Sequence, residues 1–190
     1  MKYSYSLFRF VLMTIAALVL VSSAIAQVKK PISKTGLAKS SATSSVKCVG
    51  NGLTDAEQAD LLRQQNEMRA KLKLTPFSWD CTLANYAQEW ANRGVFEHRA
   101  DSNYGENMFV ASAPAEPVGS AIVRWMSEEP NWTNKSGTCA AGKFCNHYTQ
   151  LMWRSSKKVG CGINRNGAVK WKLVLVCNYD PAGNTPGPAY

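Results

Sequence analysis

Six cysteines place the strongest constraint on how this chain can fold. They stand at positions 48, 81, 139, 145, 161 and 177. In an exported chain an even number of cysteines favours three disulfides, and the absence of a Cys-x-x-Cys spacing argues against a zinc ribbon. Cys139 and Cys145 enclose a short glycine-containing loop, which predicts that these two pair with each other. Pairing of all six would leave no free thiol, so a cysteine nucleophile is disfavoured.

The N-terminus predicts that the chain is exported. Lys2 and Arg9 give it a basic start, residues 10–21 form an apolar run, and Ala24-Ile25-Ala26 is a small-x-small cleavage pattern. We therefore expect residues 1–26 to be a secretory signal peptide and the mature protein to be extracellular, or in a periplasm or cell wall. An uncleaved anchor is the alternative, but the run is short for one. No stretch of about 20 apolar residues follows, so we expect no internal membrane span.

The positive charge of the chain lies mostly in a segment without folding signals. Residues 27–47 contain five lysines, many Ser and Thr and no acid, which indicates a flexible basic linker. Of the 22 Lys and Arg residues in the chain, 15 lie in residues 48–190 with all 13 acids, so that part is nearly neutral. The net charge of +9 therefore gives little support to a nucleic-acid partner. We favour a solvated spacer for the linker, with contact to an anionic surface as the alternative.

Helical spacing of apolar residues predicts four helices. Thr54-Asp55-Ala56-Glu57 is a capping box that starts the first one, and Gly94 fits the C-terminal cap of the second. Pro117 suits a first turn, and Pro130 stops the same helix. The predicted helices cover residues 54–73, 80–94, 117–130 and 147–153.

Three short strands are predicted between and after these helices. They cover residues 107–110, 159–163 and 170–177, and Asn166-Gly167 suggests a tight turn between the last two. Helices and strands are mixed without a regular βαβ repeat. The sequence therefore predicts an α+β fold built in layers, rather than a doubly wound nucleotide-binding sheet.

Two histidines and two glutamates are the candidate chemical groups. Glu106 precedes apolar residues of a predicted strand, so we expect its carboxylate to be partly buried and to need a cation, a metal or several donors. His98 taken alone is typical of a surface or hydrogen-bonded histidine, and for His147 a structural and a ligand role are both open. Glu128 stands at a helix end, where its charge opposes the helix dipole. Either it pairs with Arg124 at i, i+4 spacing, or it points into a shared pocket.

Two sequons lie in a predicted surface loop. They are Asn131-Trp132-Thr133 and Asn134-Lys135-Ser136. Both asparagines are candidate N-glycosylation sites if the host glycosylates.

Several motifs along the folded part occur in a recognisable order. Residues 146–156 and 175–184 form two longer stretches with Gly160-Cys161-Gly162 between them, and shorter motifs precede them at residues 66–69, 79–84, 104–107 and 125–128. Together they resemble the CAP superfamily of cysteine-rich secretory proteins, antigen-five venom allergens and plant pathogenesis-related proteins. Asn146 and Thr185 depart from the family pattern, but neither is one of the four ionisable positions.

The resemblance implies a CAP domain over residues 48–190, with its core at about residues 53–184. It implies a three-layer α-β-α sandwich with a central cleft. It also implies that four side chains converge in that cleft and can hold a divalent cation, often zinc, namely His98, Glu106, Glu128 and His147. Two imidazoles and a carboxylate suit Zn²⁺.

The resemblance further implies three disulfide pairs. Cys139–Cys145 and Cys161–Cys177 match the family, which leaves Cys48–Cys81. A two-residue turn at Asn166-Gly167 would instead place Cys161 opposite Lys172, so the second bridge requires a wider loop or another register.

The function that we expect is a secreted, non-enzymatic module that binds a ligand or partner in the cleft. Relatives suggest sterol or another lipid, or a role in defence or host interaction, and we expect a monomer. The alternative is a metal-dependent peptidase in which Glu106 or Glu128 acts as general base. No zincin motif or recognised nucleophile supports it, so we assign no catalytic residue. A weaker third interpretation is a surface-associated protein held by residues 27–47.

Overall fold

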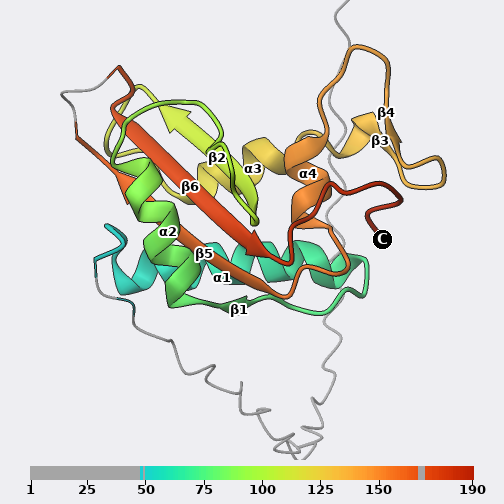
Figure 1. Ribbon diagram of the computed structural model, residues 1–190, viewed down its shortest axis with the longest axis horizontal. Helices are drawn as coiled ribbons and strands as arrows, with labels where there is room; N and C mark the ends of the chain where they lie inside the picture. The colour runs from blue at the N-terminus through green and yellow to red at the C-terminus, as the bar shows by residue number, and fades with distance from the viewer. Residues whose placement is uncertain (1–47, 49, 167–169) are drawn as a thin grey trace, which may run out of the picture. The chain divides into compact units, whose positions relative to one another are not determined.

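The computed structural model of the protein describes residues 48, 50–166 and 170–190 (Figure 1). The predicted signal peptide, residues 1–26, and the predicted linker, residues 27–47, lie outside the described residues. Within the described part, no helix is long and apolar enough to cross a bilayer.

One four-stranded sheet forms the centre of the fold. Its order is β1 (Ser78–Trp79), β5 (Lys158–Asn164), β6 (Leu173–Asp180) and β2 (Gly105–Ala111). β1 runs parallel to β5, and the other two pairs are antiparallel. Every residue of β6 except Asp180 is buried, so this strand presents an apolar surface on both faces.

Helices cover both faces of the sheet. On one face, Val174 and Val176 of β6 pack with α2 (Cys81–Ala91). The alternate residues Leu173 and Leu175 belong to a second cluster, which contains residues of α1 (Asp55–Lys71), α3 (Gly119–Met126) and α4 (Asn146–Leu151). The fold is therefore α+β, as the sequence pattern predicts, with the three α-β-α layers that the resemblance implies, and the layers can be followed in Figure 1.

A smaller two-stranded sheet lies between α3 and α4 along the chain. The 3₁₀ turn η1 (Glu129–Asn131) leads into β3 (Trp132–Thr133), which pairs antiparallel with β4 (Thr138–Cys139). Both sequons fall in this region. Asn131-Trp132-Thr133 spans the end of η1 and strand β3, so the loop predicted there is wrong, whereas Asn134-Lys135-Ser136 lies in the turn between β3 and β4.

Local capping explains where the two longest helices begin. The Thr54 hydroxyl accepts the Glu57 amide at 3.2 Å, and the Glu57 carboxylate accepts the Thr54 amide at 2.9 Å, so the predicted capping box is formed. The Asp80 carboxylate accepts the amides of Thr82 and Leu83 at the start of α2. Each cap satisfies amides that the first helical turn leaves without a partner.

The three disulfides are Cys48–Cys81, Cys139–Cys145 and Cys161–Cys177, the pairing that the resemblance implies. Cys161 lies directly opposite Cys177, and the same register places Asn164 opposite Val174. The tight turn predicted at Asn166-Gly167 is therefore wrong, because the connection between these strands spans residues 165–172. A turn signal is local, whereas the register of a strand buried on both faces is set by its neighbours.

Arg69 ties the end of α1 to the segment that follows α4. Its side chain is fully buried, and its guanidinium lies 3.9 Å from the centre of the Phe77 ring. Burial lowers the pKa of Arg69 to about 10. The guanidinium donates to four backbone carbonyls at 2.7–3.2 Å, those of Thr75, Leu151, Trp153 and Ser156. One side chain thus satisfies carbonyls that neither helix nor sheet pairs.

We predict that Arg69→Met lowers the free energy of unfolding by about 3 kcal/mol or more, because it leaves several buried carbonyls without a donor. Urea unfolding monitored by circular dichroism measures this loss. The matched control is Arg63→Met on the same helix, where Arg63 is exposed and pairs with Glu67 at 2.7 Å. The control should leave the unfolding midpoint nearly unchanged, and equal losses in both variants would contradict the role given to Arg69.

Candidate functional site

The first His–Glu pair lies where the chain passes from α2 into the edge strand β2. His98 Nδ1 lies 2.7 Å from Glu106 Oε1, and the Arg99 amide donates to the same oxygen at 3.2 Å. The Glu106 side chain is only 6% exposed, whereas that of His98 is 65% exposed. Glu106 is thus more deeply buried than the sequence suggests. The hydrogen bond to Glu106 raises the pKa of His98, and it outweighs the opposing effect of burial.

Arg99 fastens the segment that carries His98 to the outer surface of α2. Its guanidinium lies 3.6 Å from the centre of the Tyr86 ring and donates to the Tyr86 carbonyl at 3.2 Å. The Trp90 indole also donates to the Glu97 carbonyl, at 2.7 Å. Sequence reasoning missed these residues. The available signal was an arginine next to His98, together with two aromatic residues at i, i+4 spacing on the preceding helix.

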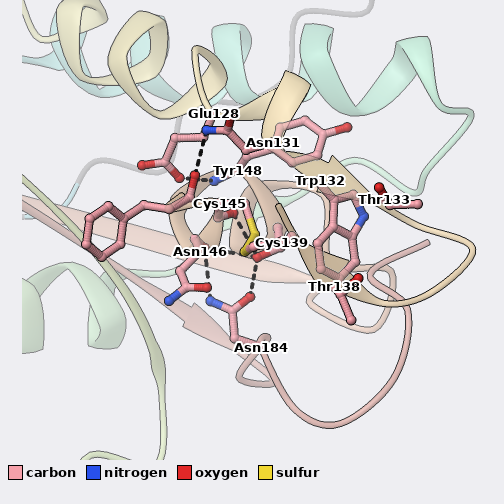
Figure 2. The surroundings of a disulfide bond; sticks show 12 residues. Glu128, Asn131, Trp132, Thr133, Thr138, Cys139, Cys145, Asn146, Tyr148 and Asn184 are labelled. Atoms are coloured by element: carbon pink, nitrogen blue, oxygen red, sulfur yellow. Dashed lines mark hydrogen bonds between the residues drawn. A yellow bond between two sulfur atoms is a disulfide. The ribbon is translucent and has the colours of Figure 1, made fainter. Parts of the chain in front are cut away.

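The second pair joins the end of α3 to the beginning of α4. Glu128 Oε1 lies 2.6 Å from His147 Nδ1, and Glu128 Oε2 accepts the amides of His147 and Tyr148 at 3.0 and 3.3 Å. Figure 2 shows Glu128 beside Tyr148 in this arrangement. Burial raises the pKa of Glu128, but the bonds from His147 and from the two amides lower it more, so the net shift is downward.

This geometry resolves the unfavourable position of Glu128 at the end of α3. The carboxylate is placed at the N-terminus of α4, where a negative charge and an acceptor are both favourable. Among the described residues, Arg124 forms no ion pair with Glu128. Glu129 belongs to the turn η1 and joins neither His–Glu pair.

The two pairs line two adjoining hollows along β2, which we together call the cleft. Its larger part has a volume of about 620 Å³ and includes Glu128 and His147. Its smaller part, of about 440 Å³, includes His98, Glu106 and His147. The two parts share four lining residues, Phe96, Met108, Phe144 and His147. Both volumes lie in the range typical of small-molecule sites.

The walls of the cleft combine apolar and charged groups. Apolar side chains come from β2 and α3 and from the two flanking loops, and they are Phe96, Met108, Phe109, Val110, Trp125 and Phe144. Arg124 and Lys143 line the larger part. Phe144 is 78% exposed although it is a large apolar residue, and it stands beside Cys145, whose disulfide anchors the loop to β4. Phe96, which also lines the cleft, is 49% exposed, so the cleft carries two exposed aromatic side chains.

The chemistry of the donors fits a divalent cation. Each imidazole uses Nδ1 for a carboxylate, and within the described residues no side chain or backbone group bonds to either Nε2. A histidine whose Nδ1–H is held by a carboxylate has its Nε2 lone pair oriented for a metal. Among the described residues, no three His, Cys, Asp or Glu side chains lie close enough together to hold an ion as they stand. The fit therefore rests on the two imidazoles, with the glutamates behind them.

Both sequon asparagines use their side-chain amides within the fold. Asn131 donates to the Phe144 carbonyl at 2.9 Å. Asn134 accepts the Tyr190 amide at 3.2 Å and donates to the Tyr190 carbonyl. Figure 2 shows Asn131 close to the Cys139–Cys145 disulfide, and Asn184 bonded to Asn146 at the start of α4.

We predict that the pKa of His98 lies above its ordinary value of 6.5 and falls towards that value in Glu106→Gln. Because the folded-state pKa is raised, the pair stabilises the fold below the unfolded-state pKa and loses that contribution as the pH rises through the folded-state pKa. An NMR titration of the imidazole in metal-free protein measures the shift. Glu97→Gln makes the same charge change next to His98 without removing the bond. An equal fall in both variants would contradict the role of the hydrogen bond.

Comparisons with known proteins agree with this fold. The model of the cysteine-rich secretory protein family, CAP, matches residues 62–179. Pathogenesis-related leaf protein 4 of Solanum lycopersicum is 39% identical over 130 residues, which cover 67% of this chain and 79% of the relative. Pathogenesis-related protein 1A of Nicotiana tabacum is 37% identical over 136 residues, 68% of this chain and 78% of the relative.

A solved structure shows the same architecture. Venom allergen-like protein 4 of Schistosoma mansoni superposes with a TM-score of 0.61 at 23% identity, over 73% of this chain and 95% of that chain. This likeness concerns the fold. Together with the family model and the plant relatives, it confirms the resemblance seen in the motifs: the chain belongs to the cysteine-rich secretory protein (CAP) family.

Proposed function

We propose that this protein is an exported CAP-family binding module whose cleft recognises a ligand and can hold a divalent cation between its two imidazoles. The observation that carries the proposal is that His98 and His147 line one pocket, each with its Nδ1 bonded to a glutamate. Among the described residues, neither Nε2 atom has a hydrogen-bond partner. When bound, a cation such as zinc would supply a Lewis-acidic centre that attracts a polar group of the ligand.

Export and a role in defence have separate support. The predicted signal peptide and three disulfides both suit an oxidising compartment outside the cytosol. The relatives from tomato and tobacco are named pathogenesis-related proteins. We therefore extend a defence role to this chain as a proposal.

Binding is favoured over hydrolysis by the state of the two carboxylates. A general base has to receive a proton from the attacking water, so it needs an oxygen that faces the substrate. Glu106 Oε1 binds the His98 ring and the Arg99 amide, and its Oε2 accepts the Asn178 side-chain amide at 3.4 Å. Glu128 binds the His147 ring and two amides of α4. Both carboxylates thus serve to orient imidazoles and backbone. We propose Glu106 and Glu128 as partners that orient the ligands, with His98 and His147 as the ligands themselves.

The apolar walls suggest what the ligand looks like. Aromatic side chains line both parts of the cleft, while Arg124 and Lys143 lie only along the larger part. A ligand with an apolar body and a polar or anionic head would match this distribution. A sterol or fatty acid satisfies that description, and we propose this class of lipid as the first to test.

We predict that calorimetric titration of Zn²⁺ into the purified protein shows one binding site per chain. His98→Ala and His147→Ala should each weaken the affinity at least about tenfold, and Glu106→Gln about 10–100-fold, because an unsupported imidazole is poorly oriented. Glu97→Gln is the matched control and should bind as the wild type does. Identical isotherms for the wild type and a His98→Ala, His147→Ala double variant would mean that both histidines are structural.

We predict that labelled sterol or fatty acid is retained saturably and that Phe144→Ser weakens retention, since Phe144 lines both parts of the cleft. Equilibrium retention on the immobilised protein measures it. Val123→Ser provides the control, because Val123 is 70% exposed and does not line the cleft. If retention saturates neither with the sterol nor with the fatty acid, lipids are removed from the proposal, and the proposed cation site is unaffected.

A further inference from the structure

The side chain of Asn134 makes a double hydrogen bond to the backbone of Tyr190. Asn134 Oδ1 accepts the Tyr190 amide at 3.2 Å, and Asn134 Nδ2 donates to the Tyr190 carbonyl. The Trp132 indole donates to the same Oδ1 at 3.3 Å and holds the amide in place. Asn134 therefore acts as a neighbouring strand would, by offering one donor and one acceptor to a single residue.

The same device occurs at two other places in the described part of the chain. Asn66 accepts the Phe77 amide at 2.7 Å and donates to the Phe77 carbonyl at 3.0 Å. Gln88 does the same with Ile163, at 2.8 and 2.9 Å. The Asn134–Tyr190 pair thus belongs to a recurring kind of contact in this fold. Of these three amides, only that of Asn134 belongs to a sequon, Asn134-Lys135-Ser136.

Covalent geometry decides which hydrogen of Asn134 a glycan would replace. In a pair of hydrogen bonds of this kind, the oxygen of the side-chain amide and the N–H on the same side of its plane both point at the partner residue. A substituted amide adopts the trans arrangement, in which the substituent takes that side and the remaining hydrogen points away from the oxygen. A sugar on Nδ2 therefore occupies the position of the hydrogen that bonds to Tyr190. The modified amide cannot serve the amide and the carbonyl of Tyr190 at once.

We propose that Asn134 is an N-glycosylation site whose modification prevents the docking of Tyr190, so that glycan occupancy controls whether the segment around Tyr190 is held against the protein. In this reaction Nδ2 bonds to the anomeric carbon of the first sugar of a lipid-linked oligosaccharide pyrophosphate, the lipid pyrophosphate leaves, and the amide loses one proton. The inference does not depend on what the cleft binds.

The order of synthesis favours the glycan over the docked state. Tyr190 follows Asn134 by 56 residues, so Asn134 enters the secretory compartment ahead of its partner. The sequon is then presented in an unfolded chain, where its amide is free to react. Thr133 and Ser136, the hydroxyl residues of the two sequons, are both exposed in the folded protein.

Docking of Tyr190 is supported by two further contacts, which should be lost with it. The Tyr190 hydroxyl lies 3.0 Å from that of Tyr148, and the Arg154 amide donates to the Ala189 carbonyl at 2.8 Å. Ala189 is buried, so release of the segment would expose it. Earlier contacts of the same segment do not involve Asn134, because the Gly183 amide bonds to Gln150 and Asn184 bonds to Asn146. Release should therefore be confined to the residues around Ala189 and Tyr190.

The two sequons should respond differently. Asn131 uses its amide for one bond, to the Phe144 carbonyl, and a glycosylated amide keeps one N–H with which to donate. A glycan on Asn131 therefore leaves one donor for this single contact. Its neighbour Asn134 needs both polar atoms on one side. This difference supplies a matched control within the same region.

The test is hydrogen exchange on full-length protein secreted from a glycosylating eukaryotic host, with occupancy of each sequon read by mass spectrometry. In the wild type, the amides of Tyr190 and Arg154 should exchange at least about tenfold faster than in Ser136→Ala, which removes only the Asn134 sequon. Thr133→Ala removes the Asn131 sequon and should behave as the wild type does. The Gly183 amide should exchange equally in all three proteins.

A second set of variants tests the contact without any glycan. In protein made in the periplasm of a non-glycosylating bacterium, Asn134→Asp keeps the shape of the side chain but cannot donate to Tyr190. It should release Tyr190 and Arg154 as the glycan does, while Asn131→Asp and Ser136→Ala should match the unmodified wild type. Three results would each overturn the proposal: a glycosylated Asn134 with Tyr190 still protected, an Asn134 left bare by the eukaryotic host, or an Asn134→Asp variant that exchanges as the wild type does.

Discussion

Burial of β6 on both faces is the constraint on which the rest of the structure depends. A strand with apolar side chains on each face has to be covered twice, and it therefore requires helices on both sides of the sheet. This arrangement leaves β2 as an edge strand whose residues alternate between the two layers. Glu106 projects with Met108 on the side of α2, while Asn107 donates to the His147 carbonyl at the start of α4. The two His–Glu pairs thus reach one cleft from opposite layers of the sandwich.

The four-stranded central sheet is small, so part of the interior backbone has no neighbouring strand to bond to. Arg69 supplies donors to four such carbonyls, and three side-chain amides each pair with the amide and carbonyl of one residue. Unpaired backbone groups are expensive to bury, so these side chains complete hydrogen bonding that longer strands would otherwise provide. Such a side-chain amide can also be covalently modified, as we propose for Asn134, and the hydrogen bonds that it supplies are then lost.

The sequence predicts those features that depend on neighbours along the chain. The first helix follows from its capping box, and α2 follows from Asp80 and the apolar stripe behind it. The tight turn at Asn166-Gly167 failed for the opposite reason, since the register of β5 and β6 depends on contacts between distant residues. The candidate site likewise has parts that the sequence predicts and parts that depend on distant contacts. The motifs marked His98 and His147, but periodicity could not reveal that Glu128 caps a different helix or that Arg99 anchors its segment to Tyr86.

The bond that orients the His98 imidazole also sets the conditions under which this ring can serve the proposed cation site. The bond to Glu106 raises the pKa of His98, so this ring keeps its second proton to higher pH than a free histidine does. A cation has to displace that proton from Nε2, so its affinity should fall as the solution becomes more acidic. Exposure adds a further difference, because the side chain of His98 is 65% exposed and that of His147 is 28% exposed. His147 is fixed by the cap of α4 and by stacking on Trp125, whereas His98 sits on a loop. We therefore propose that the less exposed ring, His147, would set the position of a bound cation and that the ring of His98 would adjust to it.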